Sequence, residues 1–164
     1  MKVYFASDHA GFETKNLLLA FVRDELGHET EDCGALSFDK DDDYPGIIAG
    51  AAGKLAVDIA AGKDNRAIIG GASGQGEAMV ANRFKGVRCA LYYGQAAIEQ
   101  TDLSGKNLDM IASTRQHNNA NALSLGFRFL SADEAKEAVR TFLSTPFSGE
   151  ERHARRVQQI DEVA

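Results

Sequence analysis

The feature that most constrains the fold is a regular alternation between short apolar runs and segments with helical periodicity. The first such pair is the strand-like run Lys2 to Ala6 and the segment Phe12 to Leu26, whose apolar residues recur at helical spacing up to Gly27. Parallel strands joined by helices produce this rhythm. Because such crossovers are right-handed, they place helices on both faces of one sheet. The alternation therefore predicts an α/β protein with a three-layer, doubly wound sandwich.

The rest of the chain continues this rhythm and predicts a five-stranded parallel sheet. We expect further strands at residues 28–33, 66–70, 87–92 and 122–125, and further helices at 47–61, 77–84, 110–117, 132–143 and about 149–163. Pro146 precedes the last helix, which predicts that this helix projects from the body. The chain has 164 residues without a repeat or a low-complexity linker, so residues 1–164 are expected to form a single Rossmann-like domain.

Composition excludes several classes of protein. Hydrophobic residues make up 44% of the chain and charged residues 26%, which is typical of soluble globular proteins. No apolar run approaches the ~18 residues of a membrane span, and the N-terminal segment lacks a cleavable apolar core. The net charge of −6 disfavours nucleic acid and anionic membranes as partners. We therefore expect a cytoplasmic protein in which Cys33 and Cys89 are core thiols.

The strongest local signal is the glycine-rich segment from Gly70 to Glu77, between a predicted strand and a predicted helix. Glycines permit a sharp turn, and free N–H groups at the start of a helix can bind an anion, such as a phosphate or an oxyanion. A dinucleotide fingerprint is excluded because Met79 stands where its third glycine belongs. No Gly-Lys pair is followed by serine or threonine, so a Walker A loop is excluded too. A tight turn without a ligand is the alternative.

Further candidate residues flank other predicted strands. They are Asp8 and His9 after the first strand, Tyr44 after an acidic run, and His117 and Asn118 before the fifth strand. Ligands of doubly wound sheets bind at the carboxyl ends of the strands, and we expect all these residues to meet at that edge. Helix capping is the alternative for Asp8 and for His117.

These segments, taken together and in order, resemble the ribose-5-phosphate isomerase B family, which includes the galactose-6-phosphate isomerase subunits. The resemblance spans nearly the whole chain. It rests on residues 7–12 (SDHAGF), 43–45 (DYP), 71–82 (GASGQGEAMVAN), 115–121 (RQHNNAN), 126–128 (GFR) and 152–156 (RHARR). It implies a metal-free, cofactor-free isomerase that interconverts ribose 5-phosphate and ribulose 5-phosphate in the pentose phosphate pathway. The reaction opens a furanose ring and moves a proton between C2 and C1 through a cis-enediolate.

The resemblance also implies where the base lies. One branch of the family uses a cysteine just before the glycine loop, and the other uses a glutamate at the end of the loop. Here the cysteine position is Gly71, so Glu77 is the expected base. A carboxylate at a helix start can have its pKa tuned by burial against the helix dipole. The oxyanion is expected to be stabilised by the backbone of four residues, namely Ser73, Gly74, Gln75 and Gly76.

For ring opening the resemblance nominates His117, with Asp8 close by. Sugar hydroxyls are expected to contact Tyr44 and Asn118. The phosphate is expected to be bound by four cationic side chains, namely His9, Arg128, Arg152 and Arg156. A solvated basic helix end is the alternative for the last two.

The resemblance implies a homodimer with shared active sites, or a tetramer built from it. The C-terminal helix would reach across the two-fold axis, so that each site receives arginines from the other chain. No set of histidine, cysteine and carboxylate residues has metal-ligand spacing, and we expect no metal site.

Two departures from the family pattern limit the assignment of substrate. Ala72 replaces a glycine of the loop, and residues 94–113 form a segment roughly ten residues longer than expected. Another aldose phosphate, such as allose 6-phosphate, galactose 6-phosphate or erythrose 4-phosphate, is therefore an alternative substrate. A sugar-phosphate-binding module without catalysis is the alternative outside enzymes.

Overall fold

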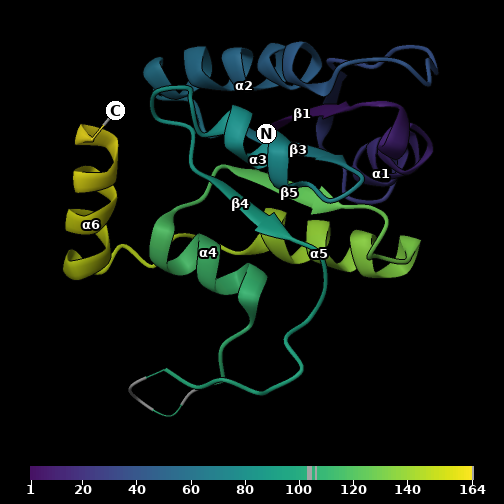
Figure 1. The fold of residues 1–164 in the computed structure, drawn as a ribbon. Helices are drawn as coiled ribbons and strands as arrows, with labels where there is room; N and C mark the ends of the chain where they lie inside the picture. The colour runs from purple at the N-terminus through teal and green to yellow at the C-terminus, as the bar shows by residue number, and fades with distance from the viewer. Residues whose placement is uncertain (103–104, 106, 164) are drawn as a thin grey trace.

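The computed structural model describes residues 1–102, 105 and 107–163, and its centre is one parallel sheet (Figure 1). The strands are β1 (Lys2–Ser7), β2 (Glu29–Asp32), β3 (Arg66–Gly71), β4 (Cys89–Tyr92) and β5 (Ala122–Gly126). They lie in the order β2-β1-β3-β5-β4, and every neighbouring pair is parallel. The expected five-stranded parallel sheet is confirmed.

Helices cover both faces of this sheet, as expected. They are α1 (Phe12–Asp24), α2 (Tyr44–Ala60), α3 (Gln75–Ala81), α4 (Met110–Asn118), α5 (Ala132–Ser144) and α6 (Glu151–Glu162), with a short 3₁₀ turn at His9–Gly11. In Figure 1, α2 and α3 lie on one face and α1, α4 and α5 on the other. Helix α6 stands outside both layers, beside α4.

Strand β1 shows why the sandwich is stable. Val3 and Phe5 contribute to the apolar core beneath α1 and α5, whereas Tyr4 and Ala6 contribute to the core beneath α2. A strand covered on both faces needs a continuous apolar run rather than an alternating one, as its sequence has. Each large aliphatic or aromatic side chain buried in this way contributes roughly 1.5–3 kcal/mol. Both cysteines are partly buried against the core beneath α2 and α3.

Two helices begin earlier than the sequence predicts. Helix α2 starts at Tyr44 rather than near residue 47, because Pro45 lies in the first turn, where a missing N–H costs nothing. Helix α3 starts directly after Gly74, which has a φ of 74°. It ends at Ala81 because the side chain of Asn82 bonds both backbone groups of Cys89 in the neighbouring strand.

The strand order creates a crevice between β1 and β3. The chain leaves β1 through α1 toward β2 on one side, and it reaches β3 on the other side through α2, which covers the opposite face. Ligands of such sheets bind at this reversal, beyond the carboxyl ends of the strands. Asp8 and the glycine-rich loop follow these two strands directly. No helix in the described part of the chain is long and apolar enough to cross a bilayer.

Candidate active site

The carboxylate of Glu77 lies over the carboxyl end of β3. Glu77 is in the first turn of α3 and only 4% exposed. A side-chain carbon at Gly71 would lie 1.9 Å from Oε1 of Glu77 and 3.3 Å from Oδ1 of Asp8. Glycine at this position therefore leaves the space that the Glu77 carboxylate occupies. Two carboxylates thus lie together at the crevice between β1 and β3.

The surroundings of Glu77 suit a general base. Burial raises the pKa of its carboxyl group, and the negative charge of Asp8 raises it further. The backbone N–H of Glu77 itself acts in the opposite direction and lowers this pKa. A carboxyl whose pKa is raised toward neutrality is a better proton acceptor in catalysis than an ordinary surface glutamate.

The loop before α3 presents backbone N–H groups at the same edge. The buried hydroxyl of Ser124 in β5 donates to the Gly74 carbonyl at 2.7 Å, which fixes the turn. The Ser73 hydroxyl accepts from the Gln75 N–H at 3.4 Å. The first N–H groups of a helix have no intrahelical acceptor and are free to bind an anion.

Ala72, which replaces a glycine of the family pattern, adopts a conformation open to alanine. In the described chain, Asn119 is the one non-glycine residue with a positive φ.

Asp8 both caps a turn and faces Glu77. The residue is 7% exposed, and its Oδ1 accepts from the Ala10 N–H at 3.0 Å. The capping alternative is thus correct for Asp8. Its charge nevertheless acts on Glu77, so capping does not remove it from the site.

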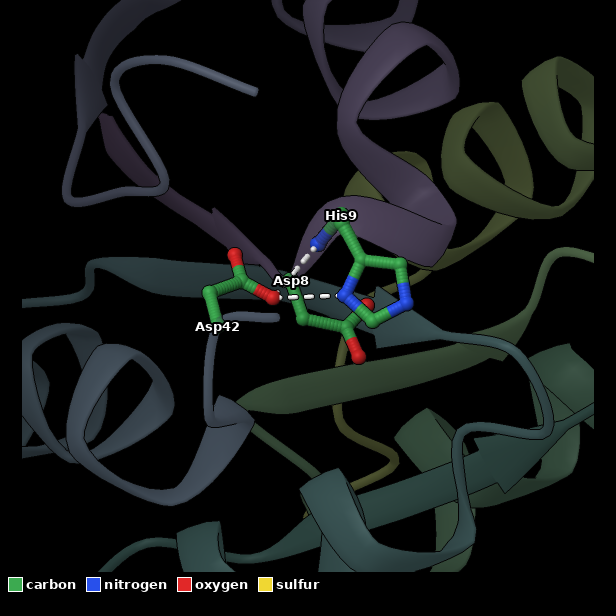
Figure 2. A group of neighbouring side chains, drawn as sticks. All are labelled: Asp8, His9 and Asp42. Atoms are coloured by element: carbon green, nitrogen blue, oxygen red, sulfur yellow. Dashed lines mark hydrogen bonds and ion pairs between the residues drawn. The ribbon is translucent and has the colours of Figure 1, made fainter. Parts of the chain in front are cut away.

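His9 is held by an aspartate that sequence analysis did not select (Figure 2). Asp42 Oδ1 lies 2.6 Å from His9 Nδ1, and it also accepts from the His9 backbone N–H at 3.1 Å. The hydrogen bond with Asp42 is the main cause that raises the pKa of His9. Burial and the charge of Arg128 lower this pKa, whereas Asp8 raises it.

Asp8, His9 and Asp42 are also the described residues that come closest to a metal-binding set. One ligand atom from each lies within 4.8 Å of the others. An ion bonded at ~2 Å to two atoms holds those atoms roughly 3 Å apart or more. The 2.6 Å between His9 Nδ1 and Asp42 Oδ1 is shorter, and it is the geometry of a hydrogen bond.

Tyr44 and Arg128 complete this edge of the sheet. A side-chain carbon at Gly76 would lie 2.4 Å from the Tyr44 hydroxyl, so Tyr44 packs directly on the glycine loop. Arg128 follows β5, its backbone N–H donates to the Ala72 carbonyl at 3.1 Å, and its side chain is exposed. The residues of this edge are hereafter the carboxyl-edge cluster: Asp8, His9, Asp42, Tyr44, residues 73–76, Glu77 and Arg128.

His117 and Asn118 do not join this cluster, so the expectation of one common edge is wrong within a chain. Both lie at the C-terminal end of α4, just before β5 begins. A residue that precedes a parallel strand lies at the amino edge of the sheet. Strand β5 has five residues. At ~3.3 Å per residue the two edges are therefore on the order of 15 Å apart.

Helix α6 forms a second cluster with α4. The rings of His117 and His153 have centroids 4.5 Å apart. His153 is 4% exposed, and its Nδ1 lies 2.8 Å from the Ser148 hydroxyl oxygen. Burial lowers the pKa of His153.

The arginines of α6 lie beside these histidines and are exposed. Arg152 Nε donates to Glu150 Oε2 at 3.1 Å, a weak surface pair. We call this group the helix-pair cluster: His117, Asn118, Arg152, His153 and Arg156. His153 belongs to a motif used for the resemblance, but sequence analysis gave it no role.

Comparison with known proteins gives consistent results over nearly the whole chain. A family model described as Ribose/Galactose Isomerase matches residues 3–160. Ribose-5-phosphate isomerase B of Mycolicibacterium paratuberculosis is 39% identical, with 99% of this chain and 91% of that protein covered. The protein of the same name from Mycobacterium tuberculosis is 36% identical, with 99% and 89% covered. The structure of ribose-5-phosphate isomerase B from Mycoplasma genitalium with bound ribulose-5-phosphate has a TM-score of 0.84 at 31% identity, covering 99% of this chain and 95% of that one.

Proposed function

The chain belongs to the ribose/galactose isomerase family, and we propose that it interconverts ribose 5-phosphate and ribulose 5-phosphate without a metal or another cofactor. The observation that carries this proposal is the buried carboxylate of Glu77, which fills the space above Gly71 beside Asp8. A base with a raised pKa at the reversal of a doubly wound sheet is what proton transfer next to a carbonyl requires.

In the proposed reaction, Glu77 removes the proton from C2 of the open-chain aldose and returns it to C1, while the hydroxyl proton of O2 moves to O1. Negative charge develops on the sugar oxygen during the first step. The backbone N–H groups of residues 73–76 lie in the loop before Glu77 and are proposed to stabilise this charge. Such donors are already oriented before the reaction, and each is worth ~3 kcal/mol in comparable enzymes.

We further propose that each active site combines residues from the two chains of a homodimer. One chain contributes Asp8, and the second contributes His117 for ring opening. Within one chain the carboxyl-edge and helix-pair clusters lie at opposite edges of the sheet, so one substrate cannot reach both. A two-fold axis that places α6 of a second copy over the crevice brings them together. Helix α6 has only two buried residues, His153 and Val157, which leaves most of its surface for such a contact.

The same arrangement completes the proposed phosphate site. His9 and Arg128 lie at the carboxyl edge, and Arg152 and Arg156 would come from the second copy. Guanidinium groups bind phosphate oxygens through paired hydrogen bonds, which suits this role. Tyr44 and Asn118 would contact the sugar hydroxyls between these groups.

Initial rates of isomerisation in EDTA test the proposed function. Ribose 5-phosphate is compared with four-carbon and six-carbon aldose phosphates, and we expect it to react fastest. Glu77→Gln should lower kcat by roughly a thousandfold while substrate binding persists. Glu137→Gln, which changes an exposed glutamate of α5, is the control.

Each other outcome of this assay has a definite meaning. A preference for another sugar would leave the proposed type of reaction unchanged and assign the difference to substrate contacts. Residues 94–113 would then be the first candidates. Of these, residues 103, 104 and 106 lie outside the described residues. Binding without turnover would favour a sugar-phosphate-binding protein. Activity that EDTA removes and a divalent ion restores would contradict metal independence.

Complementation tests the shared site separately. Glu77→Gln and His117→Ala are each expected to be inactive, and their subunits are then dissociated and reassociated at equal concentrations. If the site is shared, half of the dimers are mixed and each contains one intact site, so about a quarter of the wild-type activity should return. Recovery of no activity, with mixed dimers present, would place both residues in one chain's site.

A further inference from the structure

Asp42 lies in a segment, residues 39 to 43, in which four of the five residues are aspartate, and its environment differs from that of its neighbours. The side chain of Asp42 is 12% exposed, whereas that of its neighbour Asp41 is 74% exposed and pairs with Lys40. Oδ2 of Asp42 is buried and makes no hydrogen bond within the described residues. In the part of the chain that the structure describes, Oδ1 makes both side-chain hydrogen bonds of Asp42, one with the His9 backbone N–H and one with His9 Nδ1.

The loop that carries Asp42 is anchored at its other end. Lys15 is 1% exposed, and its ammonium group donates to both Asp32 oxygens at 2.6 Å and to the Ala35 carbonyl at 2.8 Å. The Asp42 backbone N–H donates to the Asp39 carbonyl at 3.2 Å. These contacts fix the path of the loop, so Asp42 meets His9 in a defined position.

The same loop places a second side chain against His9. The Phe38 ring stands edge-on to the imidazole, at 6.5 Å between centroids and 89° between planes. Asp42 at Nδ1 and Phe38 at the ring restrict rotation of His9. The other ring nitrogen, Nε2, points away from Asp42 and is left for a ligand (Figure 2). Buried carboxylates are stable only when their charge is compensated, and His9 is the partner that Asp42 has.

We propose that Asp42 is a positioning residue that keeps His9 as an oriented imidazolium, whose Nε2–H binds the phosphate of the substrate. This inference rests on the proposed function, in which His9 contributes to the phosphate site. It assigns to Asp42 a role in substrate affinity that does not involve contact with the sugar.

The charged groups that face His9 set the direction of the pH effect. Asp42 and Asp8 favour the protonated imidazole, and Arg128 opposes it. Because the pKa of His9 is raised mainly by Asp42, the cation persists to higher pH than in an ordinary histidine. Loss of the Asp42 charge lowers this pKa, so the decrease in phosphate affinity with rising pH should begin at a lower pH than in the wild type.

Asp42→Asn is the informative variant, since asparagine retains an oxygen that accepts from Nδ1–H but carries no charge. Asp41→Asn makes the same chemical change one residue away at an exposed position and is the control. Substrate KM and kcat are measured from pH 6 to pH 9. We expect Asp42→Asn to raise KM by about threefold to tenfold at pH 8 and by less at pH 6, with kcat within about twofold of wild type.

The titration of His9 by NMR provides a measurement that does not depend on turnover. In the unliganded wild-type enzyme, His9 should remain protonated above the ordinary histidine pKa of ~6.5. Its midpoint should fall in Asp42→Asn and stay unchanged in Asp41→Asn. A wild-type midpoint at or below ~6.5 would overturn the proposal. This measurement uses the wild-type protein, so it does not depend on whether a variant folds.

Two further outcomes separate this proposal from the proposed function. If the His9 midpoint falls in Asp42→Asn but KM and the affinity for inorganic phosphate stay equal to wild type at every pH, the proposal is wrong. If the wild-type enzyme does not isomerise ribose 5-phosphate, the proposed function fails. Inorganic phosphate binding and the His9 titration would still decide the role of Asp42 in that case.

Discussion

The carboxyl-edge cluster and the helix-pair cluster differ in how firmly the chain holds them. Glu77 and Asp8 are 4% and 7% exposed; Asp8 directly follows β1, and Glu77 lies in the first turn of the helix that follows β3. Arg152 and Arg156 are exposed on a helix outside the sandwich. The first cluster is therefore oriented by the fold of a single chain, whereas the arginines of the second are exposed and, in the proposed dimer, would contact a second copy.

This difference matches two tasks of the proposed reaction, the removal of the C2 proton by Glu77 and the binding of phosphate by Arg152 and Arg156. Proton transfer is sensitive to small displacements, so its base belongs on a rigid, buried element. Phosphate binding depends on charge and tolerates more movement, so its arginines can come from a projecting helix. Substitutions can perturb the two clusters one at a time.

Among changes that leave the proposed catalytic and binding side chains in place, the largest effect is expected at the carboxyl edge from Gly71→Ala. The new methyl carbon would lie 1.9 Å from Oε1 of Glu77, so the carboxylate must move. Displacement of a catalytic group by about 1 Å costs on the order of 100-fold, and we expect kcat to fall by that factor. Isomerisation rates and thermal unfolding together measure the effect, because the far end of a flexible side chain can move without unfolding the protein.

Gly50→Ala in α2 is the matched control. Its methyl carbon would approach the Cys33 carbonyl to 3.8 Å, which is an ordinary contact. Alanine is favoured over glycine within a helix by roughly 0.5–1 kcal/mol, so this variant should be fully active and slightly more stable. Wild-type kcat in Gly71→Ala would show that the base is not Glu77 or that its position is not critical.

A smaller effect, on affinity, is expected in the helix-pair cluster from Arg156→Ala. Loss of a hydrogen bond to a charged group should raise KM for ribose 5-phosphate by about tenfold or more and change kcat little. Arg155→Ala removes the same charge from the adjacent position of α6 and should leave KM near wild type. An equal rise of KM in both variants would indicate a general effect of charge rather than a specific contact.

The smallest effect concerns pH and the contact of α6 with α4. His153 is buried, and burial lowers its pKa in the folded state. Below pH ~6.5 the unfolded state therefore binds a proton at this histidine more readily than the folded state does. Stability from neutral His153 is thus present above pH ~6.5 and decreases as the pH falls below it. We expect hydrogen-exchange protection of α6 to fall by a few-fold between pH 7 and pH 5.5.

His153→Phe keeps an aromatic ring beside His117 but cannot titrate, so its α6 protection should change less with pH. His28, which lies between α1 and β2, also has a pKa lowered by burial. His28→Gln should leave the response of α6 unchanged. The same loss of protection in wild type and His153→Phe would mean that another group controls the contact.

The elements of the sandwich were predictable because their signals are local. Strand β1 is a short apolar run covered on both faces, and the helical spacing before Gly27 identified α1. The start of α3 was less predictable because it depends on the left-handed conformation of Gly74. That conformation is fixed by contacts with β5, which no local pattern contains.

The candidate site was predictable only in part. The glycine loop and Glu77 were found through motifs, but His117 was placed at the wrong edge because it precedes its strand rather than following it. Asp42 was missed for a different reason. Asp41, Asp42 and Asp43 are chemically identical, and only the path of the loop buries the middle one against His9.

The fit between Gly71 and Glu77 also constrains how such enzymes evolve. A side chain at position 71 would displace the Glu77 carboxylate, so the two positions compete for one volume. A cysteine introduced at residue 71 alone would have to push aside the carboxylate that is proposed as the base. Exchange of the proposed glutamate base for a cysteine at residue 71 would thus involve both positions, because the substitution at residue 71 displaces Glu77. Residues 71 and 77 should therefore change together when related sequences are compared.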